Sequence, residues 1–141
     1  MANDTTVSVG LGNGAPYENI DTSKTLAVGD NGVVQNVIAD GITITLPATG
    51  AAGLYYFTIR NGGVPASSAV GFGTGGDASV LVTVAPNASD KISGLGFTAA
   101  DNKAALNTKA TARVGDFITL VSEGVDGWTV VNSRGIWARA A

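Results

Sequence analysis

The chain has 141 residues, which is enough for one folded domain and too few for two of ordinary size. Its 45% hydrophobic content and net charge of −3 are typical of a packed globular protein and unlike a disordered one. Cysteine and histidine are both absent, which excludes thiol nucleophiles, Ser-His-Asp catalysis, disulfides and zinc sites built from thiolate or imidazole.

The first predicted element is a terminal segment, residues 1–23, which contains the glycine-rich stretch Gly10–Gly14 and few apolar side chains to bury. Terminal segments of this kind are ordered only where something ties them down. We expect a flexible N-terminal arm or a weakly attached edge over residues 1–23, followed by one folded domain over residues 24–141. The chain begins with neither a positively charged segment nor an apolar one, so no secretion signal is expected and the protein should stay in the cytosol.

The body of the chain has the composition and rhythm of β-strands. Val and Ile together number 24 against 8 Leu, and β-branched residues pack well on a pleated surface. Turn sequences such as Asp30-Asn31-Gly32, Asp40-Gly41 and Asp126-Gly127 separate short apolar runs, and they supply the positive φ of tight hairpins. Neighbouring strands should therefore pair antiparallel, in a single-domain, all-β fold of sandwich or jelly-roll type. The predicted strands are Thr6–Val9, Thr25–Val28, Val33–Ala39, Ile42–Leu46, Leu54–Arg60, Val80–Val84, Lys109–Val114, Phe117–Ser122, Gly127–Asn132 and Gly135–Ala138.

One uncharged run, Gly41–Ile59, has 19 residues and so approaches the length of a membrane span. A proline, two glycines and several threonines interrupt it, and Ile42, Ile44 and Leu46 alternate with polar residues as in a strand. We therefore expect no membrane partner.

Residues 62–79 form a long stretch rich in Gly, Ser and Ala, which predicts a functional or mobile loop. Within it, Gly71–Gly76 matches the spacing G-x-G-x-x-G of dinucleotide-binding turns. That motif must lead into a helix, whereas the strand pattern Val80–Val84 follows here. No nucleotide and no other cofactor is expected.

Residues 97–107 depart from the strand rhythm. Thr98 followed by Asp101 nearly matches a capping box, in which the third residue after the cap is Glu or Gln. One or two helical turns are the prediction for this segment.

The charged residues predict no catalytic, metal or nucleic-acid site. Two of the eleven carboxylates could in principle serve a glycosidase, but Asp30, Asp40, Asp116 and Asp126 all lie in turns, where an Asp side chain accepts hydrogen bonds from turn amides. The ligand pattern of a calcium loop is absent from the sequence. The eight Lys and Arg residues are scattered, without the basic stripe that nucleic acid requires. We expect a protein that is not an enzyme.

The aromatic residues separate into core and candidate contact positions. Tyr55 and Phe57 should share one face of their strand, with Tyr56 on the other. Trp128 and Trp137, in the last two strands, are expected at the core or rim of a sheet, and contact with a ligand or partner is the alternative. The predicted partner-binding residues are Tyr17 and Phe72 in irregular segments, together with Trp137 and the arginines near the C-terminus, Arg134 and Arg139.

Several sequence strings, taken in order, resemble the small capsid decoration (cement) proteins of tailed bacteriophages, and similar strings occur in some phage fibre modules. The resemblance covers about residues 24–138, and its most particular parts are LPA…GLYYF and GDFITLVS…GW. The strings are Leu46-Pro47-Ala48, Gly53–Ile59, Asp90–Gly94, Gly115–Ser122, Gly127–Val130 and Gly135–Trp137. The family implies a jelly-roll-like or related β-sandwich that binds the outside of the head shell as a dimer or trimer and bridges neighbouring capsid subunits.

The resulting prediction is a structural virion protein that is assembled in the host cytoplasm and lies on the outer surface of the capsid. Its partners would be the major capsid protein and other copies of itself, as a homodimer or homotrimer. Many modest contacts acting together suit such a role without catalytic machinery. The alternative is a head-fibre or tail-fibre module that binds host surface glycans or proteins, and a small virion hydrolase is the third, less favoured interpretation.

Overall fold

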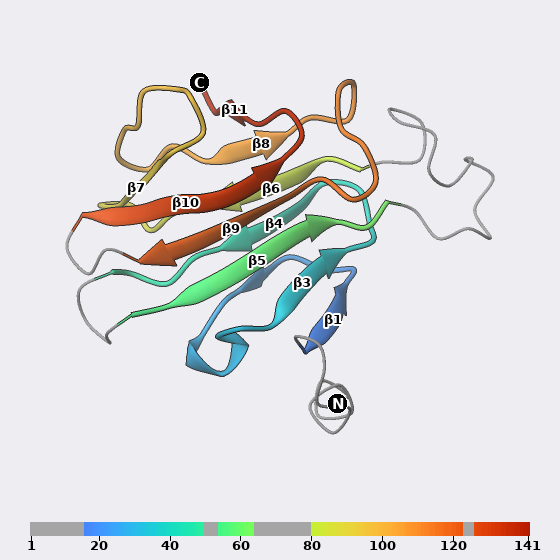
Figure 1. Ribbon diagram of the computed structural model, residues 1–141, viewed down its shortest axis with the longest axis horizontal. Helices are drawn as coiled ribbons and strands as arrows, with labels where there is room; N and C mark the ends of the chain where they lie inside the picture. The colour runs from blue at the N-terminus through green and yellow to red at the C-terminus, as the bar shows by residue number, and fades with distance from the viewer. Residues whose placement is uncertain (1–15, 50–53, 64–79, 123–125) are drawn as a thin grey trace.

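The computed structural model describes residues 16–49, 54–63, 80–122 and 126–141, and the statements below concern these ranges. The protein is all-β, with two mixed sheets and one short 3-10 helix, η1 (Val28–Asp30) (Figure 1). Sheet A contains, in spatial order, β1 (Tyr17–Ile20), β3 (Val34–Val37), β5 (Tyr56–Asn61), β9 (Phe117–Ser122), β10 (Gly127–Arg134) and β7 (Lys91–Ser93). Sheet B contains, in spatial order, β11 (Ala138–Arg139), β8 (Ala105–Asn107), β6 (Val82–Ala85), β4 (Ile42–Thr45) and β2 (Lys24–Thr25).

The chain alternates between the two sheets over its first eight strands, so odd-numbered strands lie in sheet A and even-numbered strands in sheet B. From β3 to β6, each strand lies beside the strand two places earlier and points in the same direction, whereas β7 lies beside β10 and β8 pairs with β6 antiparallel. This path makes β1, β3 and β5 parallel in sheet A and β2, β4 and β6 parallel in sheet B. A strand of the opposite sheet serves as the crossover that parallel pairing needs.

The prediction that neighbouring strands pair antiparallel is wrong for most of the molecule, since five of the nine strand pairs in the described ranges are parallel. The turn glycines themselves are where the sequence places them, and Gly32 and Gly41 both have positive φ. Those turns lead the chain from one sheet to the other instead of folding it back within a sheet. β9 and β10 are the consecutive strands that do pair antiparallel as predicted.

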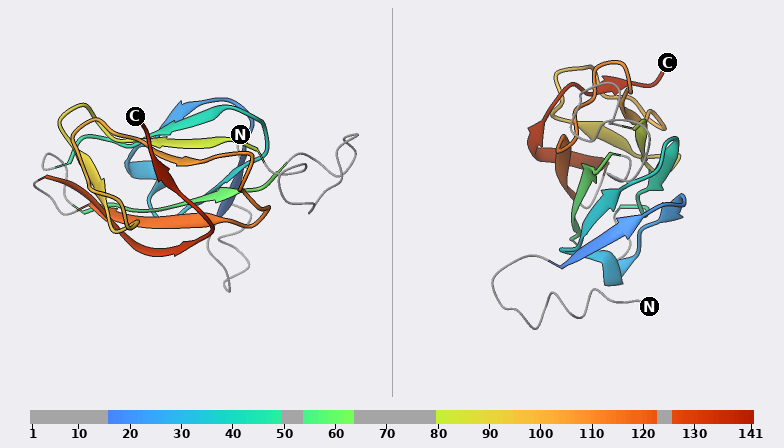
Figure 2. Two further views of the ribbon diagram at one scale, coloured as in Figure 1. Left: turned by 90° about the horizontal axis from the view of Figure 1, so that it is seen from above. Right: turned by 90° about the vertical axis from the view of Figure 1, so that its right-hand side faces the viewer.

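The core lies between the two sheets, which form the two layers visible in Figure 2. Alternate residues of each strand point into it, including Phe57 and Ile59 from sheet A and Ile44 and Val82 from sheet B, all essentially inaccessible to solvent. Tyr55, Phe57 and Trp128 pack together with ring centroids 5.5–6.1 Å apart; the rings of Tyr55 and Phe57 are stacked, and that of Trp128 is tilted against both. The predicted division of Tyr55 and Phe57 from Tyr56 is confirmed, because Tyr56 is 51% exposed.

The N-terminal segment enters the sheet earlier than predicted. β1 falls inside the expected arm 1–23, pairs with β3 as the edge strand of sheet A, and buries Ile20 in the core. Of the two predicted alternatives, an arm or an edge, residues 17–20 form an edge strand. Residues 1–15, including the predicted strand Thr6–Val9, lie outside the described ranges.

Two further local predictions are wrong. The helical turns predicted after Thr98 are absent from the described residues, because Asn102 has φ 58° and residues 105–107 pair with β6 and β11 as β8. Lys109–Val114 is no strand: the amides of Thr111 and Ala112 donate to the carbonyl of Thr108, closing a turn. In both cases pairing or local hydrogen bonding outweighs the sequence pattern.

Candidate functional site

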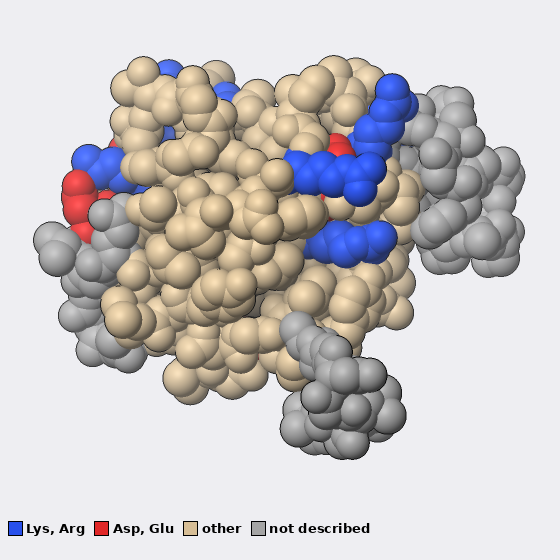
Figure 3. All heavy atoms as spheres, viewed as in Figure 1, with Lys and Arg blue, Asp and Glu red and all other residues tan. Residues whose placement is uncertain are grey.

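The outward side of sheet A, called here the sheet A face, is the most distinctive surface of the described residues. Its central positions are uncharged, and two tyrosines on it, Tyr17 and Tyr56, are 43% and 51% exposed. Figure 3 shows several basic side chains at the right-hand end of this view, beside the ends of β5 and β10, and basic and acidic side chains next to each other at the left-hand end. The outward residues of β1, β3, β5, β9 and β10 include Tyr17, Asn19, Val34, Asn36, Tyr56, Thr58, Arg60, Phe117, Thr119, Val121, Thr129, Asn132 and Arg134. At the far edge, β7 adds Lys91 and Ser93.

The outward side of sheet B has a different composition. Thr43 and Thr45 of β4 lie beside Thr83 and Ala85 of β6, and all four side chains are half-buried. Leu106 of β8 continues this surface. Threonine is uncommon among residues that dominate binding energy, whereas tyrosine and arginine are enriched there. Of the two sheets, sheet A therefore carries the better binding surface.

One cross-strand row of sheet A contains two arginines. Arg60 in β5 lies opposite Phe117 in β9, and Phe117 lies opposite Arg134 in β10. The two guanidinium groups approach the same turn: a methyl group placed on Gly115 would lie 3.6 Å from Arg134 Nη1 and 3.9 Å from Arg60 Nη2. The fold thus brings together two positive charges that are distant in the sequence.

A chain of neutral side chains holds Arg60 in place. Its Nη1 donates to Asn36 Oδ1 at 2.6 Å and to Tyr17 Oη at 3.2 Å. Asn36 is buried, its Nδ2 donates to Asn19 Oδ1 at 3.0 Å, and Gly62 leaves the space that its amide fills. These partners fix the guanidinium without neutralising its charge.

A buried polar network lies under the arginine end of the sheet. Asn61 Nδ2 donates to Asn107 Oδ1 at 2.7 Å, and Asn107 Nδ2 donates to Asp116 Oδ2 at 3.1 Å. Asp116 Oδ2 also accepts from the amide of Arg113 at 2.9 Å. Because all three side chains are almost fully buried, these bonds rigidly join β5, β8 and the turn before β9.

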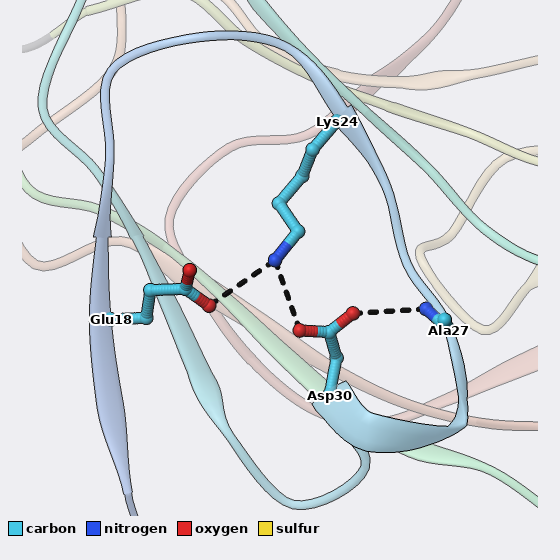
Figure 4. A network of polar contacts seen from close by, with 4 residues as sticks. All are labelled: Glu18, Lys24, Ala27 and Asp30. Carbon is cyan, nitrogen blue, oxygen red and sulfur yellow. Dashed lines mark hydrogen bonds and ion pairs between the residues drawn. The ribbon is translucent and has the colours of Figure 1, made fainter. Parts of the chain in front are cut away.

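A second charged cluster joins the edges of the two sheets near the N-terminus (Figure 4). Lys24 Nζ in β2 lies 3.2 Å from Glu18 Oε1 in β1 and 2.9 Å from Asp30 Oδ1 in η1. Asp30 Oδ2 also accepts from the amide of Ala27 at 2.9 Å. Burial by itself lowers the pKa of Lys24, but the hydrogen bonds and negative charges of Asp30 and Glu18 outweigh it and raise the pKa above 10.5.

The structure unites two of the predicted site residues, because Arg60 touches Tyr17 and shares its row with Arg134. Trp137 is a correction: it is 7% exposed, its Nε1 donates to the carbonyl of Arg134 at 3.0 Å, and it belongs to the core. Arg139 is elsewhere, in β11 of sheet B, donating to the carbonyl of Thr98 at 2.9 Å.

Phe72 lies outside the described residues. Arg60 was missed in the sequence, although it shares its predicted strand face with Tyr56. The signal available was an arginine two positions along from an outward-facing Thr58. Arg60 lies near Arg134 because β5, β9 and β10 are neighbours in the sheet, and no local sequence pattern shows that spatial order.

Among the described residues, no group of three or more His, Cys, Asp or Glu side chains is arranged to hold a metal ion. No helix in the described part of the chain has the length and apolar character to span a bilayer. Comparison of the chain with protein-family models, curated proteins and solved structures gave no match.

Proposed function

We propose that the protein is a structural virion component that binds the outer surface of a phage head and stabilises the shell by bridging major capsid protein subunits. The observation that carries this proposal is the sheet A face: a broad, centrally uncharged surface with exposed Tyr17 and Tyr56 and arginines at one end. Such a surface suits contact with another protein, because aromatic side chains and Arg contribute most of the energy of protein interfaces. The sequence resemblance to capsid decoration proteins supplies the partner.

The architecture supports a reinforcing role. We propose a β-sandwich in which two mixed sheets enclose one core, with the parallel pairs replacing the antiparallel sheets of a jelly roll. Polar contacts at the arginine end of the strands and at the edge formed by β1 and β2 hold the strands of sheet A in place, so little conformational entropy should be lost when the face docks. Oligomerisation as a dimer or trimer would multiply such contacts on a symmetric shell.

The test is the number of copies of this chain in purified virions, measured by quantitative mass spectrometry against the major shell protein. We expect hundreds of copies, in a simple ratio to the shell subunit. A few copies to a few tens would instead indicate a head-fibre or tail-fibre module and would overturn the proposal. Heat resistance of particles assembled without the chain is the second measurement, and it should fall and recover when purified protein is added back.

A further inference from the structure

The arginines at the end of the sheet A face differ from Lys24, Lys91 and Lys109 in making no ion pair with any described residue. The ion pairs in the described ranges are all made by lysines, namely Lys24, Lys91 and Lys109. No described carboxylate lies within ion-pair distance of Arg60 or Arg134. Two guanidinium groups thus converge on the Gly115 turn without a described counter-charge.

The guanidinium nitrogens of Arg60 and Arg134 that make no hydrogen bond in the described part of the chain lie at the same turn, around Gly115. Arg60 uses Nη1 for Asn36 and Tyr17, which leaves Nη2, the nitrogen nearest Gly115, without a hydrogen-bond partner in the described residues. The guanidinium of Arg134 likewise has no hydrogen-bond acceptor among them, and its Nη1 lies at the same turn. Both guanidinium groups therefore have N–H groups near the Gly115 turn that make no hydrogen bond within the described residues.

The nearest acid in the sequence, Asp116, makes no ion pair with them. Its Oδ2 accepts from Asn107 Nδ2 and the Arg113 amide, and the side chain is 1% exposed. The acceptors on Arg60 are neutral, so they orient its charge and leave it available.

We infer that Arg60 and Arg134 form a carboxylate-binding site that receives an acidic side chain of a protein partner docked on the sheet A face. A carboxylate offers two oxygens in a plane, which matches donors from two guanidinium forks. Nucleic acid suits this face less well, because the chain carries net charge −3 and the other basic residue in the described strands of sheet A, Lys91, is ion-paired with Asp126. The site rests on the proposed function only for the identity of that partner.

The site can be tested without the partner, using glutarate as the probe. We expect glutarate to shift the side-chain Nε–Hε NMR signals of Arg60 and Arg134 in a saturable way, and its uncharged diamide, glutaramide, to have no effect. Arg60→Gln and Arg134→Gln should each abolish the saturable shift at the remaining arginine. Arg139→Gln is the matched control, because Arg139 belongs to sheet B, and it should leave the titration unchanged.

Three results would overturn the inference: no saturable shift with glutarate, an equal loss in Arg139→Gln, or tighter binding of inorganic phosphate than of glutarate. Thermal unfolding of each variant shows whether it is folded. Arg60→Lys, which keeps the charge but loses the fork, should bind glutarate more weakly than the unmodified protein and more tightly than Arg60→Gln.

A second arm separates this site from the proposed function. Binding to particles assembled without the chain should weaken about tenfold in Arg134→Gln, with a smaller dependence on salt, and stay unchanged in Arg139→Gln. Glutarate binding without particle binding would keep the carboxylate site and refute the capsid role. Particle binding that both arginine variants retain at full strength would refute the site as a partner contact and leave the capsid role standing.

Discussion

The two charged clusters of the protein use charge in opposite ways. Lys24 is ion-paired with both Glu18 and Asp30, so its cluster is compensated internally and joins the edges of sheets A and B. Arg60 and Arg134 share one row of sheet A with neutral neighbours only. Compensated charges fasten parts of one chain together, whereas uncompensated charges held in a fixed position remain available to something outside it. The first cluster is thus assigned to stability and the second to binding.

The largest expected effect comes from a methyl group at the arginine end. Gly135 follows Arg134, has φ 95°, and a Cβ there would collide with the Asp116 carboxylate. We expect Gly135→Ala to lower the free energy of unfolding by about 3 kcal/mol, through backbone strain and overpacking. The matched control is Gly29→Ala beside the Lys24 cluster, where nothing lies within 4 Å, and urea denaturation should show a change below about 0.5 kcal/mol. Equal losses of unfolding free energy in Gly135→Ala and Gly29→Ala would mean that packing around the arginines is no tighter than packing beside the Lys24 cluster.

The next effect distinguishes the two sheet faces. Tyr56→Ala removes a half-exposed aromatic side chain from the sheet A face, and its backbone amide can still donate to Asn31 Oδ1. We expect binding to particles assembled without the chain to weaken by about 2 kcal/mol, or about thirtyfold. Thr83→Ala on sheet B should leave binding within about 0.5 kcal/mol of the original. A greater loss from Thr83→Ala would assign docking to sheet B.

The Lys24 cluster should contribute less than the packing at Gly135. Lys24→Gln removes both ion pairs, and we expect the free energy of unfolding to fall by about 1 kcal/mol at low salt, since partly exposed pairs contribute little. Lys109→Gln is the control, because Lys109 lies 3.8 Å from Asp40 and both side chains are about half exposed. Its effect, measured by the same denaturation, should be close to zero.

The same cluster predicts a dependence of stability on alkaline pH. The pKa of Lys24 is raised in the folded state, so its stabilising contribution is complete below 10.5 and is lost as the pH rises through the folded-state value. The difference in unfolding free energy between the original protein and Lys24→Gln should therefore shrink above pH 10.5. A difference that stays constant across this range would show that the ion pairs do not stabilise the fold.

The smallest expected effect has the opposite sign. Neighbouring like charges repel each other, so Arg134→Gln should leave the unbound protein equally stable or more stable by up to about 0.5 kcal/mol. Lys91→Gln, which breaks a 2.8 Å ion pair with Asp126, should shift stability the other way. Calorimetric melting of both variants gives the comparison, and a destabilised Arg134→Gln would mean that the arginine serves the fold.

Local chemistry in the sequence predicted much of the fold. Strands around Phe57, Ile44 and Leu120 follow from β-branched, alternating residues, and the turn at Gly32 follows from Asn-Gly. The short strands β1, β7 and β8 were missed because three or four residues carry too little periodicity. Their place is set by partners such as β3, β10 and β6.

The candidate site was only partly predictable. Tyr17 and Arg134 were singled out as contact residues, but for their positions near irregular or terminal segments rather than for their surroundings. Trp137, expected at the core or rim of a sheet and also named as a contact residue, lies in the core, where its indole N–H donates to the Arg134 carbonyl. The local sequence around an aromatic residue near the end of a chain does not show whether its ring is buried or exposed.

The sequence by itself determined that the protein is all-β, that its turns need glycine, and that Phe57 and Tyr56 face opposite ways, because these properties depend on neighbours along the chain. Only the tertiary structure decided that the chain alternates between sheets, which makes pairing largely parallel. It also decided that Arg60 and Arg134 meet, since cross-strand register through β9 is a non-local property. The two antiparallel pairs β5–β9 and β9–β10 place both arginines opposite Phe117, and a different register in either pair would separate them.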